Sequence, residues 1–130
     1  MTVIVAYAPR PEGKAALEKA IEIAARRKEK LIVVNASPGG AHEDKTMLLG
    51  FDVDELEEFL LSCGADAEFK QFVRGKNAVE EIEDLVDATN ASLLIIGLRK
   101  RSHVGKLLLG SVTQEILLTV KCPVLCVKAN

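Results

Sequence analysis

The segment from residue 92 to residue 113 decides the fold, and it reads SLLIIG (92–97), LRKRSHVGK (98–106) and LLLGSVT (107–113). An unbroken apolar run that stops at Gly97 is typical of a strand buried on both faces of a parallel sheet. Gly110 and Ser111 then predict the start of a helix, because a serine at the N-cap accepts a hydrogen bond from a free backbone N–H group. A strand, a glycine-bearing loop and a helix start together predict an anion site.

The loop between this strand and this helix is strongly basic. It carries four cations within eight positions, namely Arg99, Lys100, Arg101 and Lys106. Such charges would neutralise a bound phosphate, but a solvated basic loop between two core elements has the same pattern. The spacing alone leaves both interpretations open.

Length and composition indicate one globular domain, residues 1–130, with 48% hydrophobic and 28% charged residues. The net charge of −2 and the absence of Trp argue against nucleic-acid binding. No apolar run approaches the roughly 20 residues of a membrane span, and residues 1–6 lack the features of a signal peptide. Cys63, Cys122 and Cys126 form no Cys-x-x-Cys pair, which predicts buried, reduced thiols and a cytoplasmic protein.

Apolar runs and turn signals predict five strands that alternate with four helices. The strands are expected at 2–8, 30–37, 67–73, 93–96 and 124–127, with helices beginning at Pro11, Asp52, Asn77 and Ser111. Phe59 and Leu117 are assigned to the inward faces of their helices. Because the connections allow right-handed crossovers, the prediction is an α/β fold: a single-domain, open five-stranded parallel sheet, Rossmann-like, with helices on both faces.

Ligands of such sheets bind at the carboxyl ends of the strands, where the strand order reverses. Three predicted strands end in loops at that edge, at residues 8–10, at residues 35–37 and from Gly97 onward. The basic loop therefore lies where a small anionic ligand is expected.

Over nearly its whole length the sequence resembles the universal stress proteins. The resemblance is most specific in residues 95–97, in Ser102, in residues 109–113 and in the ending CPVLCVK (122–128). Nucleotide-binding members carry Gly-x-x-Gly, nine residues, then Gly-Ser or Gly-Thr. Here Gly97, Gly110 and Ser111 fit that spacing, and Lys100 stands at the second glycine. The resemblance also implies the fold of the adenine nucleotide alpha hydrolases.

The resemblance implies that this loop wraps the phosphates of ATP or another adenine nucleotide, with or without Mg²⁺. Phosphate and ribose contacts are then expected from Gly97, Gly110, Ser111, Val112 and Thr113. Lys100 could crowd the backbone where a glycine lets it approach, or its ammonium could neutralise phosphate charge.

The first strand departs from the family pattern at its end. Ala8 stands where the family usually has an aspartate close to the nucleoside, so a polar contact with the ligand is lost. Pro9 and Ala36 are candidate walls for an adenine ring.

The sequence favours a nucleotide-responsive regulatory module in the stress response over an enzyme. His42 and His103 belong to no nucleophile–base motif, no residue is assigned as catalytic, and no metal-ligand spacing occurs. Two alternatives stay open: a homodimer that binds no nucleotide and acts through protein contacts, and a slow ATP hydrolase. The apolar last strand, Val124 to Val127, is expected at a sheet edge, where pairing with a second copy would form a homodimer.

Overall fold

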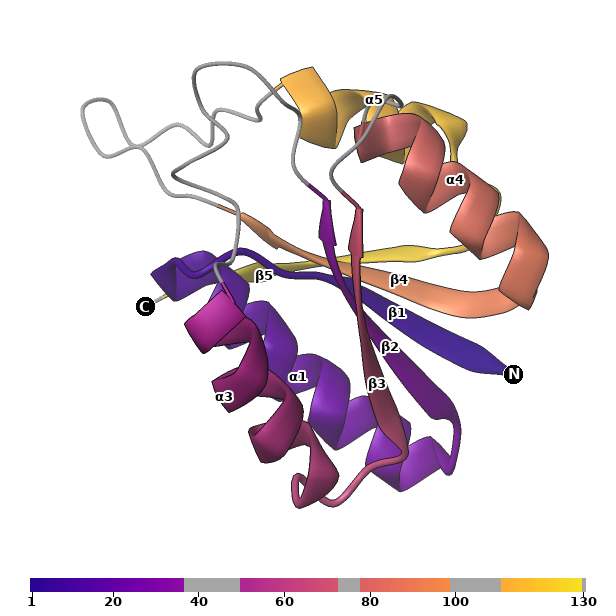
Figure 1. Cartoon of the computed structure of the whole chain (residues 1–130). Coiled ribbons are helices and arrows are strands. Elements are labelled where there is room, and N and C mark those ends of the chain that lie inside the picture. Colours follow the sequence, from indigo (N-terminus) through magenta and orange to yellow (C-terminus); the bar gives the residue numbers. More distant parts are fainter. Residues whose placement is uncertain (37–49, 73–77, 99–110, 130) are drawn as a thin grey trace.

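The computed structural model describes residues 1–36, 50–72, 78–98 and 111–129 (Figure 1). Strands and helices alternate along the chain, as the sequence predicts. In order they are β1 (Thr2–Ala6), α1 (Pro11–Arg27), β2 (Lys30–Ala36), α3 (Gly50–Leu61), β3 (Ala67–Phe72), α4 (Ala78–Thr89), β4 (Ala91–Leu98), α5 (Ser111–Thr119) and β5 (Val124–Lys128).

The five strands form one sheet in the order β3-β2-β1-β4-β5, and all four neighbouring pairs are parallel. The chain moves outward from β1 to β3, then returns to the other side of β1 to form β4 and β5. The strand order therefore reverses between β1 and β4. The predicted α/β class and parallel sheet are confirmed, and β3 and β5 are the edge strands.

Helices cover both faces of the sheet, with α1 and α3 on one side and α4 and α5 on the other (Figure 1). Successive residues of β1 serve opposite faces, since Val3 and Val5 belong to the core under α1 and α3 while Ile4 belongs to the core under α4 and α5. A strand with two buried faces needs apolar residues at every position, which explains the continuous apolar runs in the sequence.

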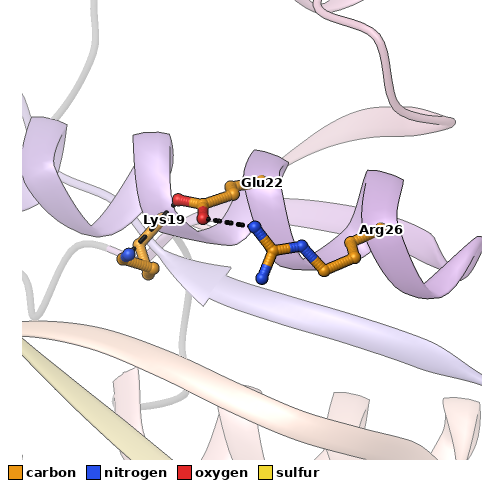
Figure 2. Close-up of polar contacts among 3 residues, drawn as sticks. All are labelled: Lys19, Glu22 and Arg26. Atoms are coloured by element: carbon orange, nitrogen blue, oxygen red, sulfur yellow. Dashed lines mark hydrogen bonds and ion pairs between the residues drawn. The ribbon is translucent and has the colours of Figure 1, made fainter.

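Helix α1 shows how local sequence sets an element. Pro11 occupies its first turn, where the missing N–H costs nothing, and Lys28 ends it in the left-handed conformation at φ 56°. On the outer face, Glu22 accepts hydrogen bonds from Lys19 at 3.2 Å and from Arg26 at 3.0 Å (Figure 2). These exposed pairs contribute only a few tenths of a kcal/mol each, so burial of the inner face holds α1 in place.

Some predicted boundaries differ from the structure. Strand β1 ends at Ala6 and not at Ala8, because the Ala8 carbonyl accepts a hydrogen bond from the Arg10 N–H group at 2.7 Å and so closes a turn. Strand β4 continues through Gly97 to Leu98, since Gly97 still pairs with Val127 of β5. Helix α3 begins at Gly50, two residues before the predicted start.

Some predicted side-chain environments were also wrong. Phe59 is 50% exposed and Leu117 is 38% exposed, because Leu56, Leu60 and Ile116 fill the space between their helices and the sheet. The three cysteines are half-buried rather than buried, and all are free thiols. Within the described ranges, every helix is too short or too polar to traverse a bilayer.

Candidate functional site

The described residues among those predicted to bind a ligand lie at the carboxyl edge of the sheet. Ala6 of β1 pairs with Val34 of β2 on one side and with Ile96 of β4 on the other, so these three strands end side by side. Ala8 and Pro9 follow β1, Ala36 is the last residue of β2, and Gly97 is the penultimate residue of β4. Of these, Ala8 is half-buried and Pro9 is exposed.

The predicted phosphate contacts divide between described and undescribed parts of the chain. Ser111, Val112 and Thr113 form the first turn of α5, and Thr113 is half-buried. Lys100 and Gly110 lie outside the described residues, as do Arg99, Arg101, Lys106 and both histidines. For Ala36, Ser111 and Val112 only the backbone is described, so the predicted N-cap role of the Ser111 hydroxyl is outside the described side chains.

The direction of α5 follows from the parallel sheet. Helix α5 connects β4 to β5, which run in the same direction, so α5 must run back against them and begin at the carboxyl edge (Figure 1). A helix start offers free backbone N–H groups and a partial positive charge of about half an elementary charge. The first turn of α5 therefore has the chemistry to bind a phosphate group.

The turn after β1 is held firmly on two sides. The Tyr7 N–H group donates to the Val34 carbonyl of β2 at 2.8 Å, one residue beyond the end of β1. Below the turn, Gly13 of α1 lies against Ala8, and a Cβ atom on Gly13 would overlap the Ala8 carbonyl oxygen. Glycine at position 13 thus permits α1 to pack directly beneath the turn.

A buried amide at this edge was missed by the sequence analysis. Asn35 of β2 is 1% exposed, and its Nδ2 donates to the Tyr7 carbonyl oxygen at 3.0 Å. Its Oδ1 accepts a hydrogen bond from Nε2 of Gln71 on β3, also at 3.0 Å. The signal in the sequence was an asparagine directly after the apolar run LIVV (31–34), at a position facing the core.

Gly97 has a packing role that the spacing argument did not reveal. A Cβ atom at this position would lie 2.6 Å from the carbonyl carbon of Glu12 and would overlap its oxygen. The first turn of α1 therefore rests directly on β4. Glycine is required here by helix–sheet contact, whether or not a phosphate also approaches.

A hollow of about 400 Å³ opens beside the same turn, between α1 and α3. Its lining includes Tyr7 and Pro9 from the turn, Leu17 from α1 and Phe59 from α3. Burial, and secondarily the negative charge of Asp52, raises the pKa of the Tyr7 phenol. Among the described residues, no group of three or more His, Cys, Asp or Glu side chains could hold a metal ion.

Comparison with known proteins identifies the family. The sequence model of the Universal stress protein family matches residues 1–128. A curated universal stress protein from Mycolicibacterium smegmatis is 44% identical over 128 residues, which cover 98% of both chains. The chain belongs to the universal stress protein family.

Solved structures of this family share the fold. A universal stress protein from Archaeoglobus fulgidus superimposes with a TM-score of 0.77 at 30% identity, covering 98% of this chain and 97% of that one. A universal stress protein from the same organism in complex with dAMP superimposes with a TM-score of 0.69 at 25% identity, covering 98% of this chain and 96% of that one. A universal stress protein in complex with cAMP gives 0.73 at 27% identity, with 100% and 98% covered.

Proposed function

We propose that this universal stress protein is a regulatory module that binds an adenine nucleotide at the carboxyl edge of its sheet. The observation that carries the proposal is the adjacency of the β1, β2 and β4 ends at the reversal of strand order, with α5 beginning at the same edge. The relatives in complex with dAMP and cAMP support an adenine nucleotide as the ligand. The family membership supports a role in the stress response.

Within this proposal, the two parts of the ligand use different segments. The phosphates approach the first turn of α5, where the backbone N–H groups of Ser111 to Thr113 are available at a helix start. The base and ribose pack against Ala8 and Pro9 after β1 and against Ala36 at the end of β2. Because Ala8 offers no carboxylate, contacts with the base depend on shape and backbone groups, and we expect a modest affinity.

Isothermal titration with AMP, cAMP and ATP, the last with and without Mg²⁺, tests this proposal. Gly110→Val is expected to abolish binding, because a β-branched side chain blocks close approach of the backbone to phosphate. Gly64→Ala is the control, since Gly64 precedes β3 at the opposite edge and a Cβ there meets no atom within 4 Å, so the strain of its φ of +93° stays away from the proposed site. Equal nucleotide affinity of wild type and Gly110→Val would contradict the proposed site.

Sedimentation and phosphate release, measured beside the titration, separate the proposal from its two rivals. A protein that binds none of the nucleotides and sediments as a dimer would favour the structural homodimer that acts through protein contacts. A protein that releases phosphate from ATP, in a reaction that Ser111→Ala abolishes, is a slow hydrolase.

The proposed assembly is a homodimer through β5. Strand β5 is an edge of the sheet, and Leu125 on it remains 36% exposed. An exposed apolar edge strand is a ready surface for pairing with another strand. Pairing of Val124 to Val127 with the same strand of a second copy would cover it around a two-fold axis. Each copy contributes one domain, residues 1–130, and we expect it in the cytoplasm, where free thiols persist.

A further inference from the structure

Asn35 is the one buried polar side chain among the residues whose burial the structure describes. The rest of the buried stretch of β2 is apolar, namely Leu31, Ile32, Val33 and Val34. A buried amide costs free energy unless its hydrogen bonds are made, so an aliphatic residue would be the simpler choice for stability alone. The presence of an amide at this position is therefore to be explained by the groups to which it hydrogen-bonds.

The Asn35 amide links the carboxyl ends of three neighbouring strands. Its donor holds the Tyr7 carbonyl beyond the end of β1, and its acceptor receives Gln71, which faces it in the β2–β3 register. Tyr7 is thereby bound to β2 through both its backbone groups, since its N–H group also donates to Val34. Residue 7 is fixed although it lies outside β1.

Fixing Tyr7 fixes the turn that follows it. The Ala8 carbonyl accepts from the Arg10 N–H group at 2.7 Å, and Gly13 of α1 packs against Ala8 from below. Asn35 is also the chain neighbour of Ala36. Together with the bond from Tyr7 to Val34, the Asn35 side chain therefore fixes the distance between the two segments that the proposed function assigns to the nucleoside.

We infer that Asn35 is a positioning residue for the nucleoside half of the ligand, an inference that rests on the proposed function. Asn35 does not touch the ligand in this scheme. It holds the turn at Ala8 and Pro9 in a preformed position beside Ala36, so that binding does not have to order that turn.

Asn35→Leu tests the inference, because leucine branches at Cγ as asparagine does and cannot hydrogen-bond to Tyr7 or Gln71. AMP and adenosine are expected to bind about tenfold more weakly to Asn35→Leu, because binding must then order a turn that one hydrogen bond holds in place in the wild type. Tripolyphosphate, which needs only the phosphate half of the site, is expected to bind within about twofold of wild type. Gln71→Leu is the matched control, since it removes the hydrogen bond between Gln71 and Asn35 and leaves the one from Asn35 to Tyr7.

A second readout needs no ligand. Hydrogen exchange at the Arg10 amide, which bonds to Ala8, is expected to accelerate in Asn35→Leu and to stay unchanged in Gln71→Leu. The Leu94 amide, which bonds to Pro123 between β4 and β5, serves as the distant reference. If Asn35→Leu does not fold, Asn35→Val, with a side chain suited to a buried strand, carries the same test.

The outcomes separate this inference from the proposed function. Wild-type affinity of Asn35→Leu for AMP, or an equal loss for AMP and tripolyphosphate, would overturn the positioning role and leave nucleotide binding intact. If wild type binds no nucleotide, the proposed function fails. Hydrogen exchange at the Arg10 amide then decides only whether Asn35 holds the turn: faster exchange in Asn35→Leu supports this structural role, and an unchanged rate overturns it.

Discussion

Replacing Gly97 with alanine should destabilise the protein even when no nucleotide is present. The added Cβ would lie 2.6 Å from the Glu12 carbonyl carbon, whereas ordinary contacts begin near 3.4 Å, so the first turn of α1 must retreat by about 1 Å. Ala16 and Ala20 of α1 are fully buried against the sheet, so α1 cannot retreat without losing contacts. Overpacking of this kind costs about 3 kcal/mol, and the lower backbone entropy of unfolded alanine returns about 1 kcal/mol.

The net loss of about 2 kcal/mol can be measured by calorimetry. For 130 residues the unfolding entropy near the midpoint is about 0.27 kcal/mol per kelvin, so the midpoint should fall by about 7 °C. Gly64→Ala is the control for conformation alone, since its φ is +93° and its added Cβ meets nothing. It should cost about 1 kcal/mol, or about 4 °C. A Gly97→Ala midpoint within about 1 °C of wild type would refute the packing argument and leave Gly97 with a ligand role only.

Three further predictions concern assembly, thiols and ligand preference. The Pro123 carbonyl accepts a hydrogen bond from the Leu94 N–H group, so the backbone groups of residues 123 and 125 face β4 and the Cys126 N–H group points to the free edge of the sheet. Cys126→Pro removes that donor and should shift sedimentation towards monomer, whereas Cys126→Ser should not. If both variants remain dimeric, the interface lies elsewhere. Burial raises the pKa of the Cys122 and Cys126 thiols above 9.0, so both should react with iodoacetamide at pH 8 more slowly than free cysteine, and equal alkylation rates would contradict this. The neutral thiols should contribute fully to the free energy of unfolding below pH 9, and this contribution should be lost as the pH rises through the raised pKa values. Lys100→Gly should change the ratio of ATP to AMP affinity, because removal of a cation near the phosphates costs the more highly charged ligand more, and an unchanged ratio would mean that Lys100 faces solvent.

The sequence by itself determined the fold class and the sheet edge at which the candidate site is proposed. Runs such as LIVV (31–34) and LLII (93–96) are apolar at every position, which is typical of a strand buried on both faces. Helical periodicity between those runs then leaves a parallel sheet with crossover helices as the simplest arrangement. That the ends of β1, β2 and β4 meet at one edge follows from the same pattern, because parallel strands with crossover helices end at a common edge, although β1 ends at Ala6 and β4 at Leu98 and not at the predicted positions 8 and 96.

The tertiary structure alone decided what individual residues do at that edge. Gly97 fitted a phosphate-binding spacing, yet its contact is with Glu12 of a helix 85 positions earlier in the chain. Phe59 fitted the inward stripe of α3, yet Leu56 and Leu60 fill the interface and leave it half exposed. Asn35 looked like the polar end of a strand, and only the register of β1, β2 and β3 places Tyr7 and Gln71 on either side of its amide. Periodicity indicates which face of an element is apolar. Contacts between segments distant in sequence depend on how the elements pack against one another, and no local sequence pattern predicts those contacts.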